Sequence, residues 1–134
     1  MADFQLDIVT PEKRVYSGAV ERFQGPGTEG SFGVLARHAP LLTSLHIGQI
    51  TFLDAAGKAR RMATSGGFAE VGRNQVTVLA ETAEFAEEID RARAQAARSR
   101  AQERLEKKEE GVDQARAEAA LARALNRLRV SGVL

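Results

Sequence analysis

The stretch Glu29-Gly-Ser-Phe-Gly-Val-Leu-Ala-Arg-His-Ala-Pro-Leu-Leu-Thr43 concentrates the structural breakers of this 134-residue chain. Gly30, Gly33 and Pro40 interrupt an apolar series made of Phe32, Val34, Leu35, Leu41 and Leu42. Glycine permits backbone angles that other residues avoid, and proline fixes its own φ and favours an extended residue before it. The stretch therefore predicts a strand, a second apolar segment, and between them a tight loop at Arg37, His38, Ala39 and Pro40.

This loop has two interpretations. A loop held between packed strands can present a binding surface on a rigid scaffold. It can also be a structural corner of a β-sandwich. The residues alone leave both open.

Short strands separated by turn signals extend through the first 85 residues. Phe4, Leu6 and Ile8 alternate with polar residues, which is typical of a half-buried strand. We expect Val15–Gln24 to be a strand kinked at Gly18, and His46 to be a strand residue. Strands are also expected at 49–53, 58–64, 68–71 and 76–80. Turns are expected at 25–30, 54–57 and 72–74. This spacing predicts an antiparallel β-sandwich.

The periodicity changes near residue 89, where alanine, arginine and glutamate become frequent. We expect one helix over Ile89–Lys108 with Asp90 as its N-cap, a break at Gly111, and a second helix that begins after Asp113 and ends near Val130. The fold class is therefore α+β: an N-terminal antiparallel β-sandwich (1–85) followed by a C-terminal antiparallel two-helix hairpin (86–134). The hairpin has few large apolar residues, so we expect the sandwich to fold alone and the hairpin to be able to detach.

Composition excludes several classes of function. A net charge of +1, one tyrosine and no tryptophan argue against nucleic-acid binding. The absence of cysteine rules out disulfides and thiolate chemistry. No apolar run reaches the roughly 20 residues of a membrane span, and no secretory signal is expected at the N-terminus. We find no catalytic constellation and no set of metal ligands.

Arginines recur along one side of each predicted helix. At 100° per residue, Arg93, Arg100 and Arg104 lie close together on the first helix. Arg116, Arg123 and Arg127 repeat this spacing on the second helix. These rows are either solvated helix faces or binding surfaces, and the fitting targets are an acidic protein surface or the phosphates of a nucleotide.

Four segments together resemble one family in the same order along the chain. They are His38-Ala-Pro-Leu-Leu-Thr43, Ser65-Gly-Gly67, Val76-Thr-Val-Leu-Ala80 and Ile89-Asp-Arg-Ala-Arg-Ala94. The chain resembles the epsilon subunit of F-type proton-translocating ATP synthases over nearly its whole length. The family usually has glycine where this chain has Arg37.

The resemblance implies a non-catalytic subunit of the central stalk, the rotor of the complex. The sandwich would bind the gamma subunit and the ring of c subunits, and so help couple proton flow to ATP synthesis. The hairpin would be regulatory and would contact the alpha/beta catalytic head transiently, inhibiting ATP hydrolysis. The resemblance also implies a peripheral location on the cytoplasmic face of the bacterial inner membrane, with no insertion into it. The isolated chain is expected to be a monomer that requires no cofactor.

The resemblance also implies three sets of site residues. Arg37, His38, Ala39 and Pro40 would form the loop that contacts the rotor. Arg116, Arg123 and Arg127 would make the inhibitory contact with the head. A regulatory ATP would be bound in the folded hairpin by Asp90, Arg93, Arg100, Arg123 and Arg127.

A different class of function remains as the alternative. A stand-alone β-sandwich could bind a small ligand and dimerise through its helical tail. The mass of the isolated protein distinguishes the two, because the alternative requires a stable homodimer.

Overall fold

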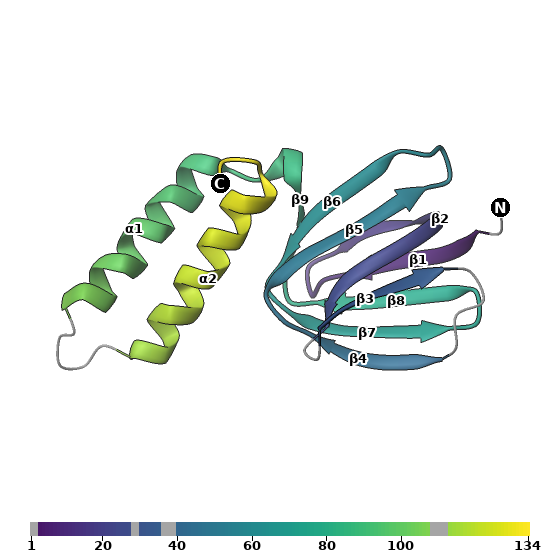
Figure 1. The fold of residues 1–134 in the computed structure, drawn as a ribbon, viewed down its shortest axis with the longest axis horizontal. Coiled ribbons are helices and arrows are strands. Elements are labelled where there is room, and N and C mark those ends of the chain that lie inside the picture. The colour runs from purple at the N-terminus through teal and green to yellow at the C-terminus, as the bar shows by residue number, and fades with distance from the viewer. Residues whose placement is uncertain (1–2, 28–29, 36–39, 108–112) are drawn as a thin grey trace. The chain divides into compact units, whose positions relative to one another are not determined.

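The computed structural model describes residues 3–27, 30–35, 40–107 and 113–134. The chain divides into two compact units, Met1–Phe85 and Ala86–Leu134 (Figure 1). The first unit contains strands and the second contains helices, so each is described by itself.

The described part of the first unit contains nine strands. They are β1 (Phe4–Val9), β2 (Arg14–Gly27), β3 (Gly30–Leu35), β4 (Leu41–Leu45), β5 (Gly48–Asp54), β6 (Ala59–Thr64), β7 (Gly67–Gly72), β8 (Gln75–Ala80) and β9 (Ala83–Phe85).

The sheet closes on itself through β2. Its strand order is β1-β8-β7-β4-β2-β5-β6-β9, β3 pairs with β2, and β1 pairs with β2 as well as β8. In Figure 1, β5 and β6 lie on one side of this unit and β4 and β7 on the other. The predicted β-sandwich followed by a helical hairpin is confirmed.

One strand pairing differs from the antiparallel expectation. β1 runs parallel to β8, from Gln5 opposite Gln75 to Val9 opposite Leu79, whereas the other recorded pairings are antiparallel. Parallel neighbours need a long connection between them, and here more than sixty residues separate the two strands.

Apolar and polar residues alternate along the strands, and the apolar side chains form a core inside the closed sheet. Phe4, Leu6 and Ile8 of β1 are buried, as are every second residue of β8 and the large side chains of the central strands: Val76, Val78, Ala80, Phe23, Ile50, Phe52 and Met62. Side chains of a strand alternate between faces, so the buried set follows directly from the apolar pattern.

Aromatic side chains complete the core at the end of the first unit. Phe85 of β9 packs against Tyr16 and Phe52, with ring centroids 6.5 and 6.4 Å away, and the guanidinium of Arg60 lies 4.1 Å from its ring centroid. The sequence pattern did not predict β9, which is only three residues long. Phe85 therefore belongs to the sandwich.

Three details of the strands differ from the sequence-based expectations. β2 runs through Gly18 without a break, and its pairing with β5 shifts between Val20 and Arg22 instead. The predicted turn at 25–30 is mostly strand, because β2 continues to Gly27 and β3 begins at Gly30, while residues 28–29 lie outside the described residues. His46 lies between β4 and β5, where its Nδ1 is 2.6 Å from the carbonyl oxygen of Ile47.

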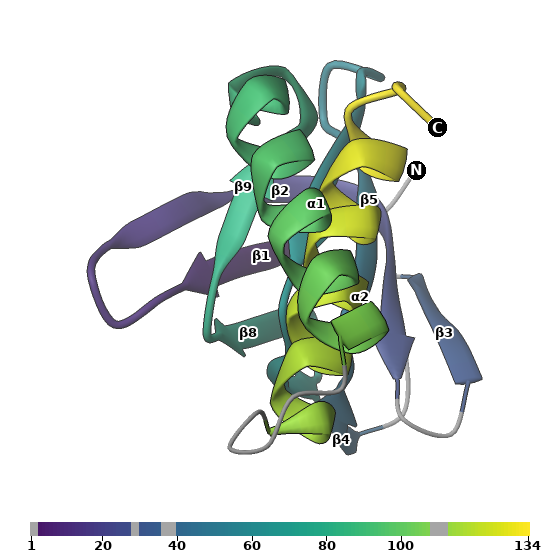
Figure 2. The same cartoon turned by 90° about the vertical axis from the view of Figure 1, so that its left-hand side faces the viewer.

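The second unit contains a short 3-10 helix, η1 (Ala86–Glu88), and the helices α1 (Arg91–Lys107) and α2 (Gln114–Val130). Figures 1 and 2 both show α1 and α2 side by side and antiparallel. The carboxylates of Asp90 and Asp113 accept hydrogen bonds from backbone N–H groups three residues later, at 3.0 and 3.1 Å. The predicted N-cap Asp90 is confirmed, and Asp113 caps the second helix, which begins after it as predicted. The predicted break at Gly111 lies outside the described residues.

Small residues are buried along both helices. They are Ala94 and Ala101 on α1, and Ala117 and Ala124 on α2, joined by Leu128. Alanine side chains let two helices approach closely but bury little apolar area. At the open end of the hairpin, an Arg91 guanidinium nitrogen donates a 2.7 Å hydrogen bond to the backbone carbonyl of Ser131.

We predict that Gly67→Ala destabilises the sandwich by more than about 3 kcal/mol. Gly67 has φ +140° and lies between Leu45 and Ala80 of the neighbouring strands, so an added Cβ would overlap the backbone of residues 79 and 80. The matched control is Gly57→Ala, which also has positive φ but has no atom within 4 Å of the added Cβ, and should cost about 1 kcal/mol. Urea unfolding measures both, and equal losses would contradict this account of Gly67.

We also predict that a protein of residues 1–88 unfolds cooperatively without the hairpin. It retains β9 and the contacts of Phe85 with Tyr16 and Phe52. A protein that ends at residue 82 lacks β9 and should be markedly less stable, by about 3–5 kcal/mol for the loss of a buried phenylalanine. Circular dichroism during thermal unfolding compares the two; identical midpoints would show that β9 is dispensable.

Candidate functional site

The predicted rotor loop joins β3 to β4. Pro40 is exposed immediately before β4, whereas Arg37, His38 and Ala39 lie outside the described residues. The structure thus fixes where the loop leaves the sandwich and says nothing of the shape of its tip.

A group of exposed apolar side chains lies next to this loop. Leu42 of β4 is 70% exposed, and Phe68 of β7 and Leu79 of β8 are each 56% exposed. Phe68 pairs with Leu79 across β7 and β8, and with Ser44, two residues after Leu42. These positions therefore share the outer face of the sheet. We call Leu42, Phe68 and Leu79 the apolar patch.

Sequence reasoning missed the apolar patch. The signal was present, because Leu79 is apolar at a position of β8 that lies between the buried Val78 and Ala80. A half-buried strand normally places polar residues on its outer face. Large apolar residues gathered on a solvent-facing sheet indicate a surface that a partner covers.

Two helices form the second candidate, a pocket of about 220 Å³ between α1 and α2. It is lined by alternating alanines and arginines: Ala97, Arg100, Ala101, Arg104, Ala120, Arg123, Ala124 and Arg127. The alanines leave space between the helices, and the arginines surround it. None of these eight lining residues is acidic.

The pocket gathers part of the predicted nucleotide site. Arg100, Arg123 and Arg127 line it together, as the matching spacing on the two helices suggested. Arg104 lines it as well, although the resemblance assigned it no role. Arg93 is exposed and precedes Arg100 by seven residues, about 10 Å along the helix axis, so it does not line the pocket.

Asp90 and Arg116 also lie outside the pocket. The carboxylate of Asp90 accepts a hydrogen bond from the backbone N–H of Arg93, so it caps α1. Arg116 is exposed two turns before Arg123, and its own backbone N–H bonds to the cap Asp113. The predicted inhibitory set therefore comprises one arginine in open solvent and two that line the pocket.

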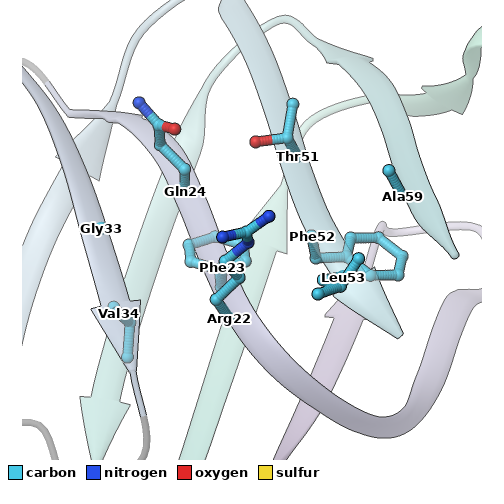
Figure 3. Close-up of a pocket in the computed structure, with 9 residues that line it drawn as sticks. All are labelled: Arg22, Phe23, Gln24, Gly33, Val34, Thr51, Phe52, Leu53 and Ala59. Carbon is cyan, nitrogen blue, oxygen red and sulfur yellow. The ribbon is translucent and has the colours of Figure 1, made fainter. Parts of the chain in front are cut away.

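A second hollow, of about 480 Å³, is lined by residues of β2, β3, β5 and β6, both exposed ones and core residues. Figure 3 shows Gln24 of β2 and Thr51 of β5 side by side, with Arg22 further along β2. Gly33 of β3 contributes no side chain, which leaves the hollow open on that side. The described residues that line it include no histidine, cysteine or carboxylate.

The carboxylate of Asp7 accepts three side-chain hydrogen bonds. The Ser17 hydroxyl donates to it at 2.6 Å, and Gln5 and Gln75 donate at 3.3 and 3.2 Å. These bonds, the Ser17 bond foremost, hold the pKa of Asp7 below its ordinary value of 3.8. Because the bonds join β1 to β2 and β8, Asp7 has a structural role. Neither a cluster of potential metal ligands nor a helix long and apolar enough to span a membrane occurs in the described part of the chain.

Comparisons with known families match both units. Residues 3–86 match the family model of the beta-sandwich domain of the ATP synthase Delta/Epsilon chain, and residues 87–132 match that of its long alpha-helix domain. A β-sandwich followed by a helical hairpin is thus the architecture of a Delta/Epsilon chain of ATP synthase. The chain belongs to the ATP synthase delta/epsilon chain family, and its recognition as the epsilon subunit of the F-type enzyme is confirmed.

Individual relatives agree with this assignment. The chain is 57% identical over 104 residues to the ATP synthase epsilon chain of Pelotomaculum thermopropionicum, covering 78% of this chain and 77% of the relative. It is 51% identical to that of Desulfatibacillum aliphaticivorans, covering 78% and 74%.

A solved structure is similar over most of the chain. A chain of the Euglena gracilis mitochondrial ATP synthase, described as OSCP/F1/c-ring in rotational state 1, matches with a TM-score of 0.80 and 27% identity, covering 91% of this chain and 77% of that one. A chain of the Tetrahymena thermophila mitochondrial enzyme shares the fold at a TM-score of 0.58 and 15% identity, with 95% of each covered.

Proposed function

We propose that this epsilon subunit is a non-catalytic part of the rotor, and that its sandwich binds the gamma subunit and the c-ring. The similar Euglena chain comes from an assembly that contains F1 and the c-ring, which supports an equivalent place for this chain. In this role the subunit transmits torque between the proton-driven ring and the catalytic head. It performs no chemistry of its own and requires no cofactor.

The observation that carries this proposal is the apolar patch. Leu42, Phe68 and Leu79 expose apolar area on one sheet face, and Leu42 lies two residues after Pro40, the last residue of the rotor loop. Permanent interfaces are more apolar than transient ones, so we assign the patch to gamma, which stays bound through each rotation. The loop from Arg37 to Pro40 then contacts the c-ring.

The double variant Phe68→Thr/Leu79→Thr should lower the affinity for gamma by at least about a hundredfold, because it removes two large apolar contacts. Threonine suits a strand, so the unfolding midpoint should change little. Binding of purified chain to gamma, measured by calorimetry, provides the test.

Gln24→Thr is the matched control, since Gln24 is exposed on β2 away from the patch. It should leave gamma binding unchanged. Full binding by the double variant would show that another face of the sandwich meets gamma.

We place the subunit on the cytoplasmic face of the bacterial inner membrane, held there through its partners. As a rotor part it occurs once per stalk, so the isolated chain should be a monomer. The alternative of a ligand-binding module that dimerises through its helices requires a stable dimer instead. The mass in solution separates the two.

We further propose that the hairpin regulates ATP hydrolysis by leaving its folded form. Arg123 and Arg127 line the pocket in the folded hairpin, and Arg127 is partly buried. Opening the hairpin frees both to join Arg116 in one row that faces the acidic surface of the alpha/beta head. Exposed ion pairs contribute only about 0.2–1 kcal/mol each, so the row acts through several contacts.

Replacing Arg116, Arg123 and Arg127 by alanine should relieve inhibition of ATP hydrolysis and leave synthesis unchanged. The companion variant Arg100→Ala/Arg104→Ala alters the same pocket from α1 but keeps the row on α2. It should remain inhibited. Hydrolysis and proton-driven synthesis by reassembled complexes measure both, and inhibition of the triple variant at the parental level would remove the row from the contact.

In the folded hairpin we propose a regulatory ATP bound by Arg100, Arg123 and Arg127. Asp90 caps the start of α1, and Arg93, which does not line the pocket, is left out of the proposed site. The support is that three of these arginines line one pocket. A bound anion offsets their mutual repulsion and stabilises the folded hairpin, so the subunit senses ATP.

A further inference from the structure

A hydrogen bond joins the two helices at the open end of the hairpin, where α1 begins and α2 ends. A guanidinium nitrogen of Arg91 donates to the backbone carbonyl oxygen of Ser131 at 2.7 Å, across forty positions of the sequence. We infer that this bond is a latch, which holds the folded hairpin closed and must break before the hairpin opens. This inference rests on the proposed regulatory opening of the hairpin and names the contact that controls it.

The latch lies at the end of the hairpin where the chain does not join the helices. Residues 108–112 connect α1 to α2 at the other end, and they limit how far the helices can separate there. Each helix has 17 residues and is about 25 Å long, so the latch is far from this connection. A bond at the open end therefore restrains separation of the helices more than a bond beside the connection would.

The acceptor of the latch belongs to a defined turn at the end of α2. The backbone N–H groups of Gly132 and Val133 donate to carbonyl oxygens of the last turn of the helix, at 3.1 and 2.9 Å. These bonds, with Gly132 at φ +88°, form a Schellman motif. The turn holds the Ser131 carbonyl in a fixed position relative to α2, and this carbonyl accepts the bond from Arg91.

The charge of Arg91 suits this position. Carbonyl groups at the C-terminus of a helix carry the negative end of the helix dipole, and a cation placed there is stabilising. Arg91 brings its positive charge to the end of α2 from the neighbouring helix. A hydrogen bond from a charged donor is also stronger than one between neutral groups. Opening of the hairpin gives up both interactions.

Large buried side chains are found at the same end of the hairpin. Among the described residues of the helical unit, the large apolar side chains that are buried are Ile89, Leu128 and Val130. All three lie within three positions of Arg91 or Ser131 in the sequence. The buried residues toward the other end are chiefly alanines, which bury little apolar area. The open end is therefore where separation of the helices meets the most resistance.

Single cysteines measure opening of the hairpin, because the chain has no cysteine of its own. Ala94→Cys places a thiol at a buried position of α1 near the latch, and Ala117→Cys places one at a buried position of α2 toward the other end. Neither position is among the lining residues of the pocket between the helices. The rate of alkylation by iodoacetamide in native buffer, divided by the rate in urea, measures how often each thiol becomes exposed.

Arg91→Met removes the donor and its charge but keeps a long side chain and a good helix former. We expect it to accelerate alkylation about tenfold at both cysteines, the low end for loss of a hydrogen bond from a charged donor, because Arg91 is exposed. Arg93→Met is the matched control, since it removes the same charge from an exposed position in the first turn of α1. It should change both rates by less than about twofold.

Three outcomes would overturn the latch. Acceleration at Ala94→Cys alone would show that only the start of α1 frays. Equal acceleration by Arg91→Met and Arg93→Met would show that net charge matters and the bond does not. Unchanged alkylation in Arg91→Met would show that the bond does not hold the hairpin closed.

Gly132→Ala tests the acceptor side of the latch. Its positive φ suits glycine, and no atom lies within 4 Å of the added Cβ, so the substitution strains the turn without a clash. We expect about threefold faster alkylation in the parent and less than about twofold in the Arg91→Met background, because both substitutions break the same latch. Effects that multiply fully in the double variant would overturn the assignment of this turn as the acceptor.

ATP hydrolysis by reassembled complexes separates the latch from the regulatory proposal. If opening inhibits hydrolysis, Arg91→Met should be inhibited more strongly than the parent, and Arg93→Met should not. Faster alkylation of Arg91→Met with unchanged inhibition would leave the latch standing and overturn regulation by opening. Unchanged alkylation would overturn the latch and leave regulation by opening to be judged from the triple arginine variant.

Discussion

The pairing of β2 with four other strands is the constraint on which the sandwich depends. This 14-residue strand bonds to β1 along its first part and to β3, β5 and β4 along its second. Because β1 also pairs with β8, the sheet closes and its inner face is sealed. A closed sheet is rigid, and its outer faces stay fixed in shape. The apolar patch and the Gln24–Thr51 hollow are therefore surfaces that a partner meets already formed.

In contrast to the sandwich, the hairpin buries few large apolar side chains. Four of the nine buried residues described in this unit are alanines, and each buried methyl group contributes only about 0.8 kcal/mol. Hydrogen bonds at the helix ends help to fix its conformation. Asp90 and Asp113 cap the helix N-termini, and Arg91 donates a hydrogen bond to the backbone carbonyl of Ser131. The alanines along α1 and α2 contribute little packing energy, and they also leave the space between the helices that the arginines surround. Weak packing and the arginine-lined pocket thus have the same origin, and this suits the regulatory role that we propose for the hairpin.

Sequence patterns within each segment predicted the helices and strands but not how these pair and pack with one another. Alternation located Phe4, Leu6 and Ile8 in the core, and short polar side chains marked both helix N-termini. The parallel pairing of β1 with β8 joins segments far apart in the sequence, so no local pattern encodes it. The apolar patch was not predicted, because Leu79 and Phe68 are ordinary strand residues in the sequence pattern. The two arginine rows were visible in the sequence, but the position of the pocket along α1 was not. Arg104 lines the pocket, whereas Arg93 lies about 10 Å before Arg100 along the helix axis and does not.

The position of Phe85 has a mechanical consequence. The backbone of the hairpin leaves the sandwich immediately after this residue, so a pull on the hairpin passes through β9. β9 is bonded to β6 over three residue pairs, and the Phe85 ring is held by Tyr16, Phe52 and Arg60. In a rotor, force applied to the hairpin therefore reaches the sandwich through this short strand. The stability of β9 sets how much force on the hairpin the sandwich withstands before it begins to unfold.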